Sequence, residues 1–129
     1  MTTKIHALID SGVRPVTVLL SPGQAGGNPG LVALLDALSE SGYRPAHLFA
    51  DKAYSHPSTR RELRRRRLRN TIPERRDQVK YRKSKGSAGG RPPKFDPELY
   101  KLRNTVERGF GRFKQWRGIA TRYDKYART

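Results

Sequence analysis

The sequence predicts an α/β fold in which a mixed β-sheet, containing an antiparallel hairpin, is flanked by helices. Three patterns favour this class. Residues 3–9 alternate in polarity, which is typical of a strand with one buried face. Residues 14–20 are rich in β-branched and apolar side chains, and residues 29–40 place leucines at helical spacing. These patterns succeed one another quickly, so residues 1–129 are expected to form one domain with a modest core.

The first third of the chain is expected to form a hairpin followed by a helix. Asp10, with the serine and glycine after it, supplies turn chemistry between the two strands, so we assign Asp10 a turn role. A loop rich in Gly and Pro follows. Asn28 is expected to cap the next helix because its side chain can accept a hydrogen bond from a free N–H group, and Gly42 is expected to end that helix.

The middle of the chain predicts two short strands around an arginine-rich helix. Residues 46–50 form a short apolar run, and Asp51 follows directly, so we predict a buried strand with an acid at its carboxyl end. Residues 57–67 are expected to be helical and residues 69–73 to form another strand. Residues 74–94 have no apolar periodicity and many Gly, Pro and Ser residues, so we predict a basic flexible loop within the same domain.

The last helix is expected to run from Asp96 to about Arg117. Asp96 is a suitable N-cap because a proline and an acid follow it. Apolar side chains at helical spacing then give the helix one apolar face. Trp116 lies on that face, and we interpret it as a core residue, with a base-stacking contact as the alternative.

A second stripe on this helix carries chemically distinctive side chains. Its members are Tyr100, Arg103, Glu107 and Lys114. At about 100° per residue, all four lie within about 60° of one another. The stripe borders the apolar face, so Glu107 is expected at the rim of the core, partly desolvated. Such a position suits a metal-ligating acid flanked by phosphate-binding groups.

Composition indicates a polyanionic partner and excludes several chemistries. The formal net charge is +17. Residues 1–40 carry a net charge of −1, whereas residues 60–94 hold fifteen Lys or Arg against three acids. This asymmetry favours a folded core with a nucleic-acid-binding surface. The absence of cysteine excludes disulfides and thiolate metal sites. No apolar run is long enough for a bilayer, so we expect a cytoplasmic protein.

Arginines of the predicted middle helix are candidates for DNA-phosphate contacts. They are Arg60, Arg61, Arg64, Arg65 and Arg67. Contacts of this type would be independent of sequence and sensitive to salt. The alternative is a solvated helix face.

Asp51 and Glu107 are the candidate metal ligands. In two-metal cleavage of phosphodiesters, carboxylate side chains hold the divalent cations. Mg²⁺ keeps several bound waters, so a few carboxylates are enough to bind it. From spacing alone a second interpretation stays open. Asp51 would cap the next helical segment, and Glu107 would pair with Arg103 or Arg108.

Three stretches resemble DDE transposases of bacterial insertion sequences: TKIHALID-SGVRPV, LFADKAYS and RNTVERGFGRFKQWRGIATRYDK. The resemblance implies a ribonuclease-H-like core. It implies that Asp51 and Glu107 are the second and third acids of a catalytic triad that binds Mg²⁺ or Mn²⁺. It also implies that Tyr100, Arg103 and Lys114 contact DNA phosphates. The implied partners are transposon ends and target DNA in the bacterial nucleoid, and a homodimer is compatible with the family.

The family places its first catalytic Asp on a strand upstream of the TKIH-like segment. This chain starts at that segment, so we expect a partial fold that lacks the first core strand and the first acid. The predicted function is that of a DNA transposase catalytic-domain fragment, incomplete or inactive by itself. The alternative is a non-catalytic basic nucleic-acid-binding protein.

Overall fold

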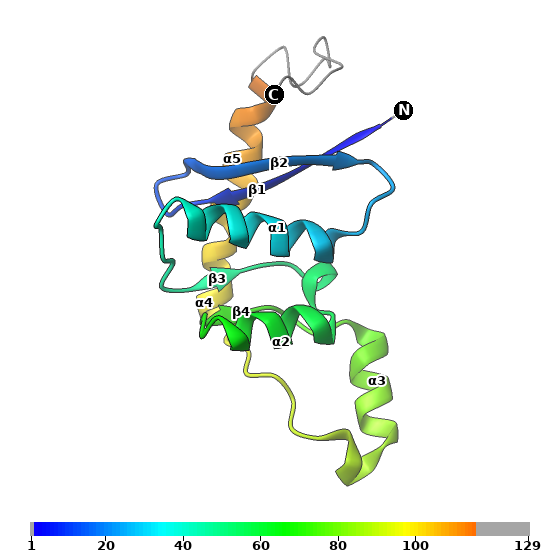
Figure 1. Ribbon diagram of the computed structural model, residues 1–129. Coiled ribbons are helices and arrows are strands. Elements are labelled where there is room, and N and C mark those ends of the chain that lie inside the picture. The colour runs from blue at the N-terminus through cyan, green and yellow to red at the C-terminus, as the bar shows by residue number, and fades with distance from the viewer. Residues whose placement is uncertain (1, 116–129) are drawn as a thin grey trace.

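The computed structural model describes residues 2–115, in which strands and helices alternate (Figure 1). Its strands and α-helices are β1 Thr3–Ile9, β2 Pro15–Pro22, α1 Gly27–Glu40, β3 Leu48–Phe49, α2 Pro57–Arg65, β4 Asn70–Thr71, α3 Arg76–Ser84, α4 Pro97–Tyr100 and α5 Asn104–Gln115. Three short 3₁₀ helices complete the described part: η1 Lys52–Tyr54, η2 Gly86–Gly89 and η3 Lys101–Arg103.

The predicted antiparallel hairpin is confirmed. β1 pairs with β2, and Leu8 lies opposite Thr17. Asp10 takes the predicted turn role, because its carboxylate accepts hydrogen bonds from the Arg14 N–H at 2.9 Å and from Arg14 Nε at 3.0 Å. These contacts close the turn that fixes the register of the hairpin.

The described strands form two separate sheets rather than one mixed sheet. β1 and β2 make the antiparallel pair, and β3 pairs with β4 in parallel, with Leu48 opposite Asn70. The α/β class is therefore confirmed, while a continuous sheet is absent from the described part of the chain. The physical reason is that β3 and β4 are only two residues long, and no described strand joins β1 to β3.

The core lies between α1, α2 and the parallel pair. Its buried members are Leu31, Leu35, Leu48, Leu63 and Ile72. Each contributes about 1.5–3 kcal/mol by leaving water. Leu8 of the hairpin packs against this cluster, so α1 connects the two sheets (Figure 1).

The start of α1 differs from the prediction. The N-cap is Gly26, without a side-chain cap, and Asn28 lies inside the first turn. Asn28 Oδ1 instead accepts a hydrogen bond from the Thr59 hydroxyl at 2.9 Å. A tertiary bond between α1 and α2 has thus replaced the local cap. Gly42 follows the helix end with a φ of 79°, a left-handed conformation that glycine adopts without strain.

The prediction of a flexible loop over residues 74–94 is wrong, because this segment contains α3 and η2. Gln78 accepts a hydrogen bond from the Arg75 N–H at 3.2 Å, which satisfies a free donor at the helix start. Arg82 pairs with Glu74 at 2.9 Å. Local capping and ion pairing therefore hold a helix that has no buried residue. In Figure 1, α3 extends away from the body of the molecule.

The predicted C-terminal helix is divided into α4, η3 and α5. Asp96 caps α4 as predicted, accepting from two backbone N–H groups at 3.0 and 3.2 Å. α5 packs on β1 at Gly109, where an added Cβ would lie 3.0 Å from three atoms of Ile9. Trp116 and Arg117 lie outside the described residues. None of the described helices is long and apolar enough to cross a bilayer.

Candidate functional site

Asp51 lies directly after β3, as predicted. Pairing with β4 fixes this strand, and Leu48 anchors it in the core. Asp51 is also the N-cap of η1, where its Oδ1 accepts a hydrogen bond from the Ala53 N–H at 2.8 Å. The Asp51 side chain is 42% exposed, so it remains accessible from solvent.

Glu107 lies in the first turn of α5 and faces solvent. Its side chain is 63% exposed, so the expectation of a partly desolvated acid at the rim of the core is wrong. That expectation assumed one regular helix. The 3₁₀ segment η3 turns by about 120° per residue rather than about 100°, which shifts the phase of everything after it. Leu102, which belongs to the expected apolar face, lies within η3 and is 57% exposed.

Arg103 brings the two acids into one cluster. Its Nη2 lies 3.8 Å from Asp51 Oδ2, and its Nη1 lies 3.3 Å from Glu107 Oε1. The structural contacts considered as the alternative are therefore both present, since Asp51 caps η1 and Glu107 pairs with Arg103. The same contacts also bring together Asp51 and Glu107, two acids that are distant in the sequence.

Tyr100 belongs to the same cluster. The Arg103 guanidinium carbon lies 6.0 Å from the centre of the Tyr100 ring. Burial raises the pKa of Tyr100 above its ordinary value; Arg103 acts in the opposite direction, and Asp51 and Glu107 raise it further. The phenol therefore stays neutral at physiological pH and keeps its proton as a hydrogen-bond donor.

Lys114 is the one member of the predicted stripe that stands apart. It is exposed near the end of α5, and no ion pair among the described residues links it to Asp51 or Glu107. The structure thus gathers Tyr100, Arg103 and Glu107 beside Asp51, and it leaves Lys114 farther along the helix.

The donor atoms of this cluster suit a hard divalent cation in kind but not in number. Asp51 and Glu107 provide two accessible carboxylates, the ligand type that Mg²⁺ prefers. Within residues 2–115 there is no group of three or more His, Cys, Asp or Glu side chains that could hold a metal ion. The guanidinium of Arg103 also pairs with both acids. A complete metal centre would need another carboxylate and a different position for Arg103.

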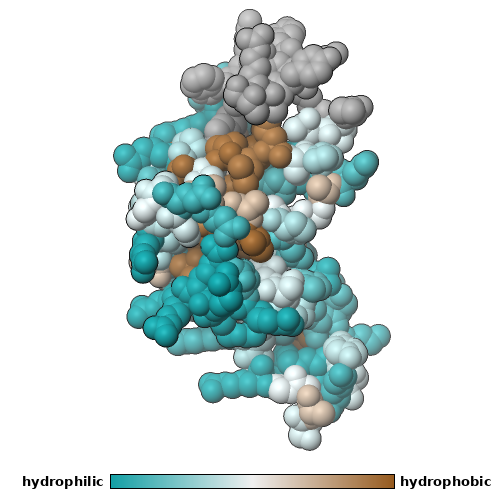
Figure 2. All heavy atoms as spheres, viewed as in Figure 1, coloured by the Kyte–Doolittle hydropathy of each residue, from teal (hydrophilic) through white to brown (hydrophobic). Residues whose placement is uncertain are grey.

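The predicted DNA-binding arginines fall into two groups. Arg60 is partly buried and donates a hydrogen bond from Nη2 to the Ile72 carbonyl at 2.9 Å. Arg65 pairs with Glu62 through two hydrogen bonds of 2.6 and 3.0 Å. Arg65 is nevertheless exposed, as are the three remaining arginines, Arg61, Arg64 and Arg67. Hydrophilic side chains accordingly cover the surface over α2 (Figure 2).

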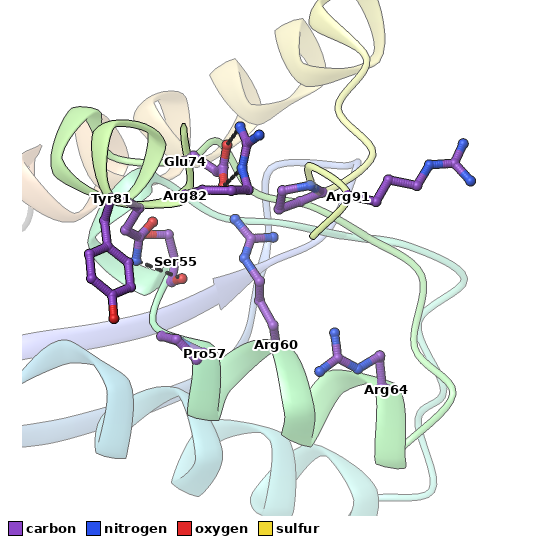
Figure 3. A pocket seen from close by; sticks show the side chains of 10 residues that line it. Ser55, Pro57, Arg60, Arg64, Glu74, Tyr81, Arg82 and Arg91 are labelled. Carbon is purple, nitrogen blue, oxygen red and sulfur yellow. Dashed lines mark hydrogen bonds and ion pairs between the residues drawn. The ribbon is translucent and has the colours of Figure 1, made fainter. Parts of the chain in front are cut away.

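Arg82 and Arg91 are basic residues that sequence reasoning left in a flexible loop. Together with Arg60 and Arg64, they line a pocket between α2 and α3 (Figure 3). The missing apolar periodicity hid α3. One available signal was Gln78 at the third helical position, where its side chain accepts a hydrogen bond from the N-cap N–H.

Fold and site define a class: a basic α/β protein with a carboxylate cluster at the end of a buried strand. The model of the family described as "Transposase DDE domain" matches residues 1–129, the whole chain. The chain is also 33% identical over 125 residues to a protein of Brucella ovis that carries the provisional name of transposase for insertion sequence element IS6501. That match covers 97% of this chain and 85% of the relative. The chain therefore belongs to the DDE transposases of insertion sequences. No solved structure matches the chain.

Proposed function

We propose that residues 1–129 form a DNA transposase catalytic domain, in part or in whole, that acts in cleavage and strand transfer at insertion-sequence ends. The observation that carries this proposal is the contact of Arg103 with both Asp51 and Glu107. A basic protein that collects two accessible acids at a strand end has the elements of phosphodiester chemistry. The proposed cofactor is Mg²⁺ or Mn²⁺, and the proposed partners are transposon ends and target DNA.

Each residue of the cluster has a proposed role. Asp51 and Glu107 would hold divalent cations, which activate the attacking oxygen and stabilise the leaving oxygen in reactions of this class. Without bound cations, Arg103 offsets part of the negative charge of the two acids. When cations are bound to the acids, Arg103 can turn to a DNA phosphate. The neutral phenol of Tyr100 can donate a hydrogen bond to the same phosphate. Lys114 and the exposed arginines of α2 would add contacts to the backbone of more distant DNA.

We also propose that this domain needs a third acid for activity. Two observations support this. The described residues provide two carboxylates at the cluster, and the described strands form two sheets that share no pairing. A further strand between β1 and β3 would join the sheets, as in the ribonuclease-H-like core that the resemblance implies. Its side chains would then reach the position beside Asp51.

A second candidate function is that of a non-catalytic nucleic-acid-binding protein. One observation favours it: residues 2–115 contain no group of three or more side chains that could hold a metal ion. The net charge of +17 fits this function equally well.

The test compares Glu107→Gln with Arg64→Ala. Mn²⁺ binding is followed by electron paramagnetic resonance, DNA binding by fluorescence anisotropy and nicking on supercoiled DNA. For a transposase domain, Glu107→Gln weakens Mn²⁺ binding and abolishes any metal-dependent nicking while leaving metal-free DNA binding nearly unchanged. Arg64→Ala has the opposite profile, because it removes a phosphate contact and no metal ligand.

Glu98→Gln is the matched control, since Glu98 is an exposed acid of α4 that pairs with Lys101 at 2.8 Å. Equal Mn²⁺ affinities of the Glu107→Gln and Glu98→Gln variants would reject the metal assignment. The second candidate function would then be supported.

A further inference from the structure

The pocket between α2, α3 and residues 91–93 has a volume of about 280 Å³ and lies apart from the acid cluster. Arg60 and Arg64 reach it from α2, Arg82 from α3, and Arg91 from the segment that follows η2 (Figure 3). Four arginines from three parts of the chain thus border one small hollow, and the Arg91 side chain extends away from the other three (Figure 3). The pocket is large enough for a phosphate with its sugar but far too small for a double helix.

The positive charge of this pocket is only partly compensated by the described residues that line it. Glu74 is the single acid among the residues that line it. Both of its oxygens are already engaged by Arg82, at 3.4 Å from Nε and 2.9 Å from Nη2. Arg60, Arg64 and Arg91 are therefore left without a described carboxylate partner in the pocket. Converging cations of this kind are stabilised by an anion.

Arg60 is the cation that is held most firmly. Its hydrogen bond to the Ile72 carbonyl fixes the guanidinium next to the core. Burial lowers the pKa of Arg60, Glu74 raises it and Arg64 lowers it, so two like charges face the same hollow. A phosphate between them would remove this repulsion.

An unused polar group lies in the wall of the same pocket. Ser55 is 2% exposed, and its hydroxyl has no hydrogen-bond partner among the described residues. The neighbouring backbone is occupied, because the Ser55 carbonyl accepts from Gln78 Nε2 at 3.1 Å. Buried hydroxyl groups rarely remain without a partner in a folded protein, so this one points to a ligand.

The pocket also has an aromatic border. The Tyr81 ring is 63% exposed, and Lys85 Nζ lies 4.5 Å from its centre. Exposed aromatic rings beside cations are typical platforms for unpaired bases. On the far side, Arg91 is shared with a second hollow that ends at Phe95, whose ring lies 5.2 Å from that of Tyr100. A basic and aromatic path therefore leads from this pocket to the acid cluster.

We propose that the pocket lined by Arg60, Arg64 and Arg91 binds a phosphate of single-stranded DNA, with a neighbouring base stacked on Tyr81. Residues 91–95 then guide the strand toward Tyr100 and Arg103. The inference rests on the proposed DNA partner but requires no metal chemistry, so it can fail or hold independently of the roles of Asp51 and Glu107.

The experiment measures fluorescence anisotropy of a labelled single-stranded oligodeoxynucleotide and of the matching duplex, with EDTA present. The pocket variant is Arg64→Ala with Arg91→Ala. The control is Arg61→Ala with Arg76→Ala, which removes the same charge from exposed positions on α2 and α3 outside the pocket. We expect the pocket variant to lose about tenfold in single-strand affinity and the control about twofold. Equal losses would overturn the proposal in favour of general electrostatic attraction.

Substitutions of Tyr81 provide a second test, because they change the affinity for a single strand without changing the charge of the protein. Tyr81→Ala should weaken single-strand binding by about fivefold or more and leave duplex binding unchanged, while Tyr81→Phe should restore it. No loss with Tyr81→Ala would overturn the stacking. Circular dichroism of each variant establishes that it is folded.

Inorganic phosphate is the remaining probe, since free phosphate shares the chemistry of a DNA phosphate. The proposal predicts that phosphate competes with the oligonucleotide at high concentration for the wild-type protein and loses this effect in the Arg64→Ala, Arg91→Ala variant. The assignment to DNA would be overturned if the Arg64→Ala, Arg91→Ala variant lost phosphate binding but kept its affinity for the oligonucleotide.

Discussion

The acid cluster and the arginine pocket differ in the sign of their charge and in how much of it other side chains offset. At the cluster, one guanidinium lies near two carboxylates, so Arg103 offsets one of the two negative charges of Asp51 and Glu107. In the pocket, the one carboxylate is already committed, and Arg60, Arg64 and Arg91 face the hollow without an acid. The cluster therefore keeps an excess of one negative charge, which a metal cation can offset, whereas the pocket keeps an excess of positive charge, which an anion can offset. From this difference we expect DNA to bind this chain first through the pocket. We also expect a metal ion to compete with Arg103 for the carboxylates of Asp51 and Glu107.

The two regions also differ in their support. The pocket stands on α2, which contributes Leu63 to the core, and on the Ile72 carbonyl next to it. The cluster stands on the two-residue strand β3, on the 3₁₀ helix η3 and on the first turn of α5, and its acids are 42% and 63% exposed. Both regions nevertheless depend on one core, since Leu48 of β3 packs in the same group as Leu63.

Leu63→Ala should give the largest effect, because it removes the support that the two regions share. Leu63 is 0% exposed, and its truncation should lower the free energy of unfolding by about 2–5 kcal/mol. Leu102→Ala, at a leucine that is 57% exposed, should cost about 0.5 kcal/mol or less. Urea unfolding followed by circular dichroism measures both. Similar losses for the two variants would contradict the position of the core between α2 and β3.

The salt dependence of DNA binding should separate the two regions next. Each phosphate contact that is lost reduces the slope of log affinity against log salt by about 0.7 for a single strand. Arg64→Ala with Arg91→Ala should therefore lower the slope by roughly one unit or more. Asp51→Asn with Glu107→Gln should not lower the slope in the absence of metal, because it removes no cation and frees Arg103 from its two acids. An equal change in both variants would show that the cluster, too, is part of the phosphate-binding surface.

Much of the local structure could be predicted from the sequence because local rules decide it. The hairpin follows from alternation and from the turn chemistry of Asp10, and Asp51 follows from an apolar run that ends in an acid. α2 likewise begins at Pro57, within the predicted range. Residue type and position suggested Asp51 and Glu107 as candidate acids but left a structural alternative open, and the family resemblance favoured the metal-binding interpretation. Their common contact with Arg103 is a finding of the structure.

The errors arose where tertiary contacts or a change of helix type decided the outcome. Asn28 was expected to cap α1, but its side chain bonds Thr59 of α2 instead. Glu107 was expected to be partly buried, but η3 changed the helix phase before it. α3 was missed because it is held by ion pairing and a polar cap rather than by an apolar face. The pocket was missed with it, since Arg82 has a defined position only once α3 exists.

Arg103→Ala should turn the partly compensated cluster into an uncompensated one. Removal of the guanidinium leaves two carboxylates without a counter-charge, so Mn²⁺ affinity should rise about threefold to tenfold, as expected for about 1 kcal/mol of interaction near water. The pKa of Tyr100 should rise as well, because Arg103 is the charge that lowers it. The difference between the ultraviolet titrations of this variant with and without Tyr100→Phe reports that pKa.

Lys101→Ala is the control, since Lys101 is a neighbouring cation paired with Glu98 rather than with the cluster. It should change neither Mn²⁺ affinity nor the titration of Tyr100. Matching increases in Mn²⁺ affinity for the Arg103→Ala and Lys101→Ala variants would mean that net charge, and not the position of Arg103, sets the affinity.

The smallest effect should come from Glu62. This acid forms ion pairs with Arg65 at the end of α2 and with Arg66 directly after it, so neither arginine is left without a carboxylate partner. Hydrogen bonds from Arg65 and then from Arg66 lower the pKa of Glu62 to about 2. Since the folded pKa lies below the ordinary value, the stabilisation is complete above about pH 4.5 and is lost as the pH falls toward 2. Glu62→Gln should make the free energy of unfolding depend less on pH between about 2 and 4.5. At the acid end of this range the variant and the wild-type protein should have similar stability. The same variant should bind single-stranded DNA slightly more tightly at neutral pH, because Arg65 loses its carboxylate partner, whereas Arg66 keeps Asp36. An unchanged acid profile together with unchanged DNA affinity would show that these arginines are compensated elsewhere, and the contrast between the two regions would then rest on the pocket alone.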